Sequence, residues 1–182
     1  YKNTAAAPNH HFELQTKSLF VNDMVDVGYG SRPAVADVNG DGLLDIVVGN
    51  YGTYANSKGT YASLFLFLNV GTAEAPQFSL ADRNWLNMAE FAPDNDYDFS
   101  PTFGDIDGDG DQDLIVGHND GGFFCYRNSA GPGVPMNLSR DFDPMWQNMD
   151  VVGLVAAPTL FDLTGDGLLD LARCRRRIQP LP

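Results

Sequence analysis

A nine-residue acidic motif that occurs three times constrains this chain more than any other feature. In the copy at residues 105–113, five aspartates alternate with other residues, two of which are glycines. The other copies span residues 37–45 and 162–170. Each copy follows a proline and a short apolar run, so the pattern P-x-x-x-D-x-[DNT]-G-D-G-x-x-D recurs in one register. A pattern of this length that recurs three times indicates a repeat protein.

The chemistry of the motif points to a metal ion. Carboxylates this close repel one another unless a cation lies among them, and oxygen-only ligands favour a hard ion such as calcium. Gly108 and Gly110 allow the tight turn that directs loop positions 1, 3, 5 and 9 inward. We predict structural Ca²⁺ at two or three sites, bound by those side chains and by the backbone carbonyl of position 7. The predicted ligands are Asp37, Asn39, Asp41, Leu43 and Asp45; Asp105, Asp107, Asp109, Asp111 and Asp113; and Asp162, Thr164, Asp166, Leu168 and Asp170.

The three predicted sites differ in charge. Thr164 replaces an acidic or amide ligand in the third loop, which is why the number of sites is given as two or three. By charge count, calcium affinity should fall from the second loop to the first and then to the third. An EF-hand, which begins in the same way, needs a bidentate Glu at position 12. That position holds Val48, Val116 and Arg173 here, so the sequence predicts a loop between two strands instead.

Composition excludes several classes of function. The chain has a formal net charge of −13, and eleven of its 24 acidic residues lie in the three loops, which argues against a nucleic-acid partner. No apolar run reaches 18 residues, so no membrane span is predicted. Cys125 and Cys174 occupy non-equivalent repeat positions, which favours two small buried residues over a disulfide framework. The three histidines form no repeated acid/base arrangement, so we predict no enzyme activity.

The repeat extends well beyond the loops. Successive loops begin 68 and 57 residues apart, which defines a unit of about 60 residues built from four short strands and their turns. Radial repetition of such a unit shields sheet edges, so we predict an all-β fold of β-propeller blades; a β-sandwich array is the structural alternative. The stretch 85–91 could add one helical turn.

The positions of the repeated motifs divide the chain into units. The predicted units are the end of a preceding blade at 1–24, full repeats at 25–88 and 89–149, and the start of a third at 150–182 with an irregular tail from residue 173. This organisation is expected of a fragment of a larger propeller. The arginines of the tail are interpreted either as an unreliable repeat end or as a basic patch.

Two further segments leave alternatives open. The tyrosine-rich insertion at 51–61 is either a solvated hairpin extension or a contact surface for a glycan or a protein. The acidic run 94–98 is either a solvated connection or a further cation site.

The repeat units resemble a known family. PAVADVNGDGLLDIVVGN, PTFGDIDGDGDQDLIVGHNDGGFFCYRN and PTLFDLTGDGLLDLA are similar to FG-GAP/VCBS-type repeats, which build the propeller of integrin α-chains and of many bacterial surface and secreted proteins. The resemblance covers the chain up to about residue 172. It implies propeller blades with calcium in the loop that joins the first two strands of a blade. It also implies a secreted or cell-surface location and a role in adhesion or ligand binding.

Three functional hypotheses follow. The first is a calcium-stabilised extracellular binding or adhesion module whose protein or carbohydrate ligand is unknown. The second is a catalytic or non-catalytic propeller part of a polysaccharide-degrading enzyme. The third is a repeat subunit of a surface fibre, in which open sheet edges would drive self-association.

Overall fold

The computed structural model describes residues 2–5, 10–14, 25–52, 61–91, 98–149 and 154–176. Its strands are β1 (Lys2–Asn3), β2 (Phe12–Glu13), β3 (Arg32–Ala36), β4 (Asp45–Gly49), β5 (Leu64–Asn69), β6 (Phe78–Asp82), β7 (Ser100–Gly104), β8 (Asp113–Gly117), β9 (Phe123–Asn128), β10 (Leu138–Asp141), β11 (Leu154–Phe161) and β12 (Asp170–Arg176). The 3₁₀ helix η1 (Trp85–Glu90) and the short helix α1 (Pro144–Asn148) complete the described secondary structure. Neither of these helices is long and apolar enough to cross a membrane.

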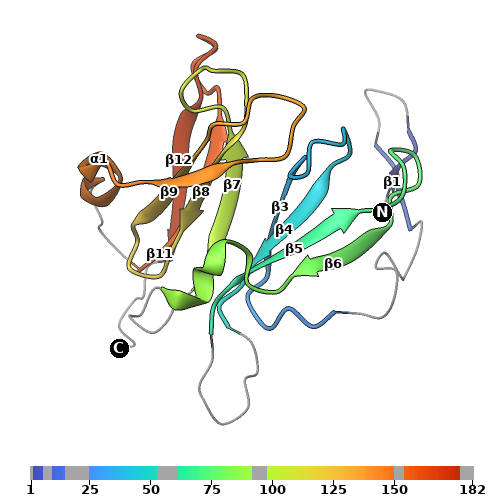
Figure 1. The fold of residues 1–182 in the computed structure, drawn as a ribbon, viewed down its shortest axis with the longest axis horizontal. Helices are drawn as coiled ribbons and strands as arrows, with labels where there is room; N and C mark the ends of the chain where they lie inside the picture. Colours follow the sequence, from blue (N-terminus) through green and yellow to red (C-terminus); the bar gives the residue numbers. More distant parts are fainter. Residues whose placement is uncertain are drawn as a thin grey trace.

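The strands form antiparallel sheets in which each strand pairs with the next along the chain. Two sheets have four strands, in the orders β3-β4-β5-β6 and β7-β8-β9-β10 (Figure 1). β1 pairs with β2, and β11 pairs with β12. Each acidic loop connects the first two strands of its sheet: β3 to β4, β7 to β8, and β11 to β12. The sheets have the strand order of propeller blades, which confirms the predicted fold class.

Neighbouring sheets meet along their first strands. β7 lies between β3 and β11, and the two four-stranded sheets stand side by side (Figure 1). The N–H of Phe99 donates to the carbonyl oxygen of Asn50 at 3.0 Å, and the N–H of Ala156 donates to that of His118 at 3.1 Å. Because these two hydrogen bonds occupy equivalent places, the same contact joins the first sheet to the second and the second to the third.

Two glycines permit this close approach. A Cβ on Gly49, at the end of β4, would lie 2.1 Å from the carbonyl oxygen of Phe99. A Cβ on Gly117, at the end of β8, would lie 2.2 Å from that of Ala156. The position that ends the apolar run IVVG or LIVG therefore has to be glycine, because the backbone of the next blade occupies the space of a side chain.

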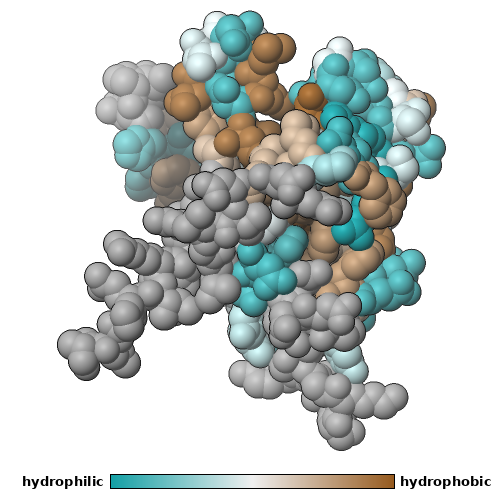
Figure 2. Space-filling view, turned by 90° about the vertical axis from the view of Figure 1, so that its left-hand side faces the viewer, coloured by the Kyte–Doolittle hydropathy of each residue, from teal (hydrophilic) through white to brown (hydrophobic). Residues whose placement is uncertain are grey.

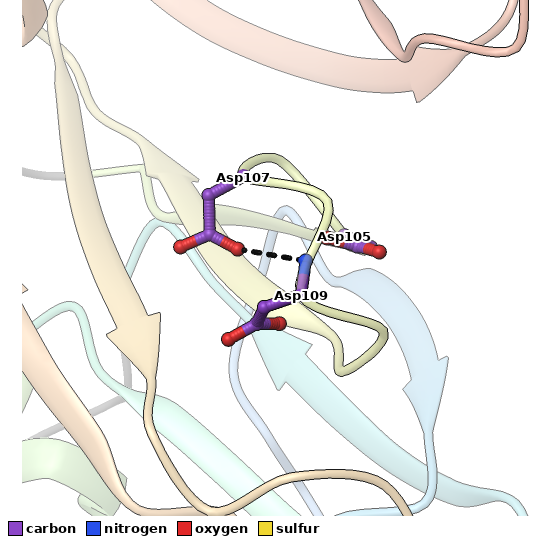
Figure 3. A group of neighbouring side chains, drawn as sticks. All are labelled: Asp105, Asp107 and Asp109. Carbon is purple, nitrogen blue, oxygen red and sulfur yellow. Dashed lines mark hydrogen bonds between the residues drawn. The ribbon is translucent and has the colours of Figure 1, made fainter.

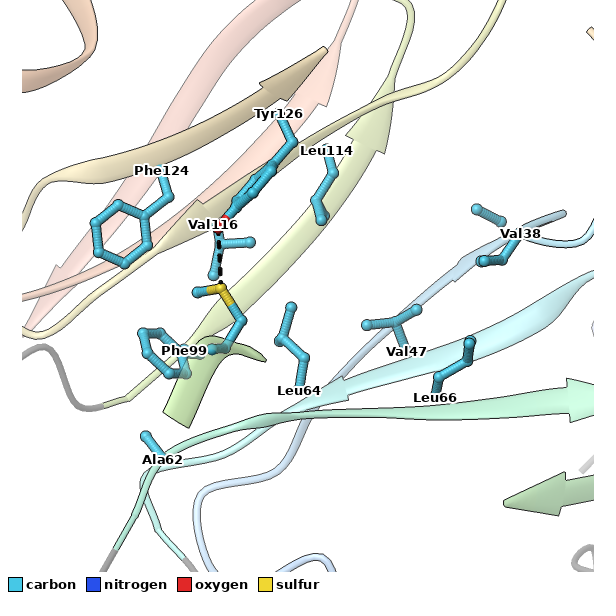
Figure 4. Packing of buried hydrophobic residues seen from close by; sticks show 12 residues of the cluster. Val38, Val47, Ala62, Leu64, Leu66, Phe99, Leu114, Val116, Phe124 and Tyr126 are labelled. Atoms are coloured by element: carbon cyan, nitrogen blue, oxygen red, sulfur yellow. Dashed lines mark hydrogen bonds between the residues drawn. The ribbon is translucent and has the colours of Figure 1, made fainter. Parts of the chain in front are cut away.

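The largest hydrophobic cluster fills the space between the two four-stranded sheets (Figure 4). Met88 of η1 enters it, and the hydroxyl of Tyr126 donates to its Sδ at 3.2 Å. This burial explains why a helical turn interrupts a chain of strands: it places one apolar side chain between the blades. The cluster consists of Ala36, Val38, Val47, Ala62, Leu64, Leu66, Met88, Phe99, Leu114, Val116, Phe124 and Tyr126.

A second cluster lies between the second sheet and the β11–β12 pair. It contains Ile115, Cys125, Trp146 and Ala156, among others. Cys125 is fully buried with a free thiol, and burial raises the pKa of this thiol to about 12. Cys125 is thus a small buried residue, as predicted; the side chain of Cys174 lies outside the described residues.

Two elements differ from the sequence-based expectation. β12 continues as a strand to Arg176, whereas an irregular tail was expected from residue 173. The reason is that pairing with β11 uses backbone groups, which arginine supplies as well as any other residue. Helix α1 was not anticipated because it has only five residues, although Asp143 caps it by accepting a hydrogen bond from the N–H of Met145 at 2.8 Å.

On the face shown in Figure 2, apolar surface occurs in separate groups between polar ones. Phe142 and Met145, at the end of β10 and in α1, are among the exposed apolar side chains of the described residues.

Candidate metal centres

The backbone of all three acidic loops adopts the same turn. The glycines at loop positions 4 and 6 have positive φ angles in every copy, for example +80° at Gly108 and +94° at Gly110. A side chain in this left-handed region is strained, so these two positions favour glycine. The repeated sequence D-G-D-G, N-G-D-G or T-G-D-G therefore encodes the turn itself.

The first aspartate of each loop organises that turn. In the second loop, Asp105 accepts hydrogen bonds from the N–H of Gly108 at 2.6 Å and from that of Gly110 at 3.0 Å. Asp37 and Asp162 make the equivalent bonds in the first and third loops. These hydrogen bonds lower the pKa of Asp162, the largest contribution coming from the N–H of Gly167. In all three loops the first aspartate thereby fixes the turn through its hydrogen bonds to the two glycines.

The second loop brings three of its predicted ligands together. Asp105, Asp107 and Asp109 each place one carboxylate oxygen within 4.8 Å of the others. Figure 3 shows the carboxylates of Asp107 and Asp109 next to each other, with the side chain of Asp105 across the turn. The N–H of Asp109 donates to Asp107 Oδ1 at 3.3 Å. These side chains come from positions 1, 3 and 5, as the calcium prediction requires.

The carboxylate of Asp111, at position 7, is also held in this loop. It is 4% exposed, and its Oδ2 accepts a hydrogen bond from the N–H of Gly131 at 2.7 Å. Its Oδ1 has no hydrogen-bond partner. Burial raises the pKa of Asp111, and the nearby carboxylates of Asp109 and Asp107 raise it further. The sequence pattern predicted only the backbone carbonyl of this residue as a metal ligand, so its buried carboxylate is a further candidate ligand.

The ninth residues of the first and second loops are held by backbone hydrogen bonds. Asp45 and Asp113 are fully buried. Asp113 accepts hydrogen bonds from the N–H of Ile106 at 3.0 Å and from that of Asn128 at 2.8 Å; Asp45 makes the same two bonds in the first repeat. Burial raises the pKa of both carboxyl groups, against these hydrogen bonds. In the first two repeats this aspartate therefore ties the loop to the third strand of its own blade.

The first loop has fewer charges at the same positions. The side-chain N–H of Asn39 donates to Asp41 Oδ2 at 2.8 Å, and Asp41 Oδ1 accepts from the N–H of Leu43 at 2.8 Å. The two oxygen-bearing side chains at positions 3 and 5 are thus in contact. In the third loop Asp166 accepts from the N–H of Leu168 at 2.9 Å in the same way. Thr164 contributes its backbone N–H to Asp170 at 3.3 Å.

These residues fit a hard divalent cation. The donors are all oxygen atoms, three carboxylates of the second loop converge, and a buried oxygen of Asp111 lacks a partner. The residues that would hold an ion in the second loop are Asp105, Asp107 and Asp109, with Asp111 beside them.

A repeated asparagine was missed as a functional part of each unit. Asn69 Oδ1 accepts from the N–H groups of Gly71 and Gln77, at 3.0 and 3.1 Å. Asn128 makes the equivalent bonds, and so does Asn3 in the β1–β2 turn. The recurrence of an asparagine before each of these turns, at residues 3, 69 and 128, was the available signal.

Arg127 was also missed, and no repeat pattern could have revealed it. Its Nη1 lies 3.3 Å from Asp107 Oδ2 and 3.5 Å from Asp113 Oδ2. The equivalent position of the first repeat, next to the turn asparagine, holds Leu68. An arginine at one copy of a repeat carries no periodic signal, because its partners become neighbours only in the folded blade.

Two further segments, the insertion 51–61 and the acidic run 94–98, were also considered as sites from the sequence. Most of the insertion 51–61 lies outside the described residues, and of the acidic run 94–98 only Asp98 is described. Asp98 forms an ion pair with Arg32 of β3, which links the two sheets. That pairing gives Asp98 a structural role.

Comparison with known families identifies the repeat. The family model described as FG-GAP-like repeat matches residues 37–116 and 105–172, which together cover most of the chain. Repeats of this kind are consistent with extracellular, adhesion-type modules. Comparison with curated proteins and with solved structures gave no match. The repeated blades, the aspartate loops and the family match agree, and the chain belongs to the FG-GAP-like repeat family.

Proposed function

We propose that this chain is a calcium-stabilised propeller segment of an extracellular binding or adhesion module. The observation that carries the proposal is the convergence of Asp105, Asp107 and Asp109 within 4.8 Å. A divalent ion among these carboxylates would remove their mutual repulsion and would bind the folded loop but not the unfolded chain. Binding of this kind adds directly to the free energy of unfolding.

The coupling from loop to blade supports a structural role for the ion. Asp113 begins β8 and accepts hydrogen bonds from the start of the loop and from the end of β9. An ion that fixes the loop therefore also fixes the junction of β7, β8 and β9. Extracellular calcium modules bind at ~10⁻⁴–10⁻³ M, which matches a secreted or cell-surface location.

We propose a non-catalytic role for the loops. Carboxylates that hold a cation stay ionised and are poor general acids or bases. The ligand of the module is then a protein or a carbohydrate that binds elsewhere on the blades. The extracellular setting rests on the family, whose repeats typify extracellular proteins.

Thermal unfolding in excess EDTA and across a calcium titration tests the metal assignment. At 100 times the dissociation constant, one site should add about 2.7 kcal/mol to the free energy of unfolding. Asp109→Asn should reduce this gain, whereas Asp82→Asn, which removes another exposed carboxylate outside the loops, should leave it unchanged. A melting temperature that does not respond to calcium would contradict the proposal.

Binding to immobilised polysaccharides and extracellular-matrix proteins tests the adhesion role. We expect retention on at least one class of these probes in calcium and its loss in EDTA. Retention that persists in EDTA would show that ligand binding does not depend on calcium. Absence of retention on every probe would contradict the adhesion role.

A further inference from the structure

Arg127 places a permanent positive charge against the second acidic loop. It lies one residue before the end of β9, and its Nη1 is 3.3 Å from Asp107 Oδ2 and 3.5 Å from Asp113 Oδ2. This Nη1 is buried and has no hydrogen-bond partner of good geometry, so its contact with the loop is mainly electrostatic. An arginine stays protonated at any pH at which the protein is folded.

The guanidinium is held from its other side as well. Asp141 Oδ2, on β10, accepts a hydrogen bond from Arg127 Nε at 3.4 Å and one from Trp146 Nε1 at 3.0 Å. The guanidinium carbon lies 5.9 Å from the centre of the Trp146 ring, and Trp146 is 6% exposed. These contacts fix the charge beside Asp107 and Asp113 instead of leaving it free to turn into solvent.

The first repeat has no such charge. Leu68 occupies the position of Arg127 and packs against the hydrophobic cluster between the sheets. Within the described part of the chain, no basic side chain forms an ion pair with the loop at residues 37–45. The second loop therefore differs from the first in having both more carboxylates and a cation that the chain itself supplies.

We propose that Arg127 is a resident counter-cation of the second loop: it holds the loop closed without metal and lowers the calcium affinity of that loop. The inference rests on the proposed calcium function. An arginine that attracts Asp107 partly neutralises a predicted calcium ligand, and a second cation entering the loop is repelled by the first. A count of loop carboxylates alone thus overstates the calcium affinity of the second loop.

The test is a calcium titration followed by NMR in the parent chain and in Arg127→Met. The amides of Gly108 and Gly110 report the second loop, and those of Gly40 and Gly42 report the first loop in the same sample. Methionine keeps a long apolar side chain and removes the charge. We expect the midpoint at the second loop to move to about tenfold lower calcium, because the charge that repels the entering ion has been removed, while the midpoint at the first loop stays in place.

Two control variants separate a local charge from other effects. Arg127→Lys keeps the charge and should retain the parent midpoint at the second loop. Arg83→Met removes an exposed arginine outside the loops and should also retain it. A midpoint in Arg127→Met that is unchanged, or that moves to higher calcium, would overturn the inference; the latter would make Arg127 a residue that positions Asp107 for the metal.

A metal-free measurement tests the other half of the inference. In EDTA, amide hydrogen exchange at Gly108 and Gly110 should be faster in Arg127→Met than in the parent, because the loop loses its internal cation. Equal exchange rates would overturn the inference. If no loop glycine responds to calcium in any variant, the proposed calcium function fails, and the exchange rates still decide whether Arg127 closes the loop.

Discussion

The carboxylate of Asp45 accepts a hydrogen bond from the backbone N–H of Asn69 at 2.8 Å, across 24 residues of sequence. Its other oxygen accepts from the N–H of Val38 at 2.9 Å. A fully buried side chain thus joins the acidic loop to the third strand of the blade, and Asp113 does the same in the next repeat.

Asp45→Asn should lower the free energy of unfolding by about 1–3 kcal/mol. The amide keeps one acceptor but turns an NH₂ group toward a backbone N–H, which leaves a buried donor without a partner. Urea unfolding in EDTA measures the change without a contribution from metal. Glu74→Gln, which makes the same kind of substitution at an exposed turn residue, is the control and should be within 0.5 kcal/mol of the parent, roughly the range of surface substitutions. Equal stability of the two variants would argue against a structural role for Asp45.

Asn69→Ala should cost about 1 kcal/mol or more, because two turn N–H groups lose their acceptor. Asn128→Ala should behave alike in the second repeat. Asn69→Asp retains an acceptor oxygen and should recover part of the loss. Gln77→Ala alters an exposed side chain of the same turn and serves as the comparison in urea unfolding. A loss in Gln77→Ala as large as that in Asn69→Ala would show that the turn, and not its asparagine, is sensitive.

Gly117→Ala should destabilise the contact between the second and third sheets. The new Cβ would meet the carbonyl oxygen of Ala156 at 2.2 Å, so the neighbouring strand must move. We expect a loss of about 1–3 kcal/mol, the usual range for overpacking, in thermal or urea unfolding. Gly133→Ala tests backbone strain alone, since Gly133 has a φ of +74° and open space around it. Because the clash displaces the strand that contains Ala156, Gly117→Ala should also increase the rate of amide hydrogen exchange at Ala156. Gly133→Ala should leave that exchange rate unchanged.

The acid sensitivity of the protein should include a contribution from Asp141. The N–H of Asp143 and the indole N–H of Trp146 donate to its carboxylate and lower its pKa below the ordinary value of about 3.9. A carboxyl group whose pKa is lower in the folded state stabilises the fold above the unfolded-state pKa, and this stability is lost as pH falls through the folded-state pKa.

Asp141→Asn should therefore be less stable than the parent at neutral pH, and the difference should shrink below about pH 4 as the parent carboxylate is protonated. Urea unfolding at a series of pH values from 7 to about 3 measures both curves. A stability difference that is constant over this range would mean that the charge of Asp141 does not contribute.

Most of the architecture was predictable because it depends on patterns of residues that are close in the sequence. The three D-x-[DNT]-G-D-G-x-x-D loops mark the junction of the first two strands in each blade, and their glycines adopt the positive φ angles that the turn needs. The alternation of apolar runs and turns predicted four strands in each unit, and the sheets have that order. The convergence of Asp105, Asp107 and Asp109 also follows from local geometry, since the outermost two are only four positions apart in the sequence.

The rest depended on contacts between residues far apart in the chain. Sequence alone determined the repeat, the strand order and the acidic loops, because each is fixed by residues that are close in sequence. Only the tertiary structure decided that Asp113 turns inward to Asn128 and that Arg127 reaches Asp107. It also decided which glycine faces the next blade, because backbone atoms of different repeats come within contact distance only when the sheets stack. The charge and hydrogen-bond partners of these groups are properties of the packed blades, and no periodic pattern of residues encodes them.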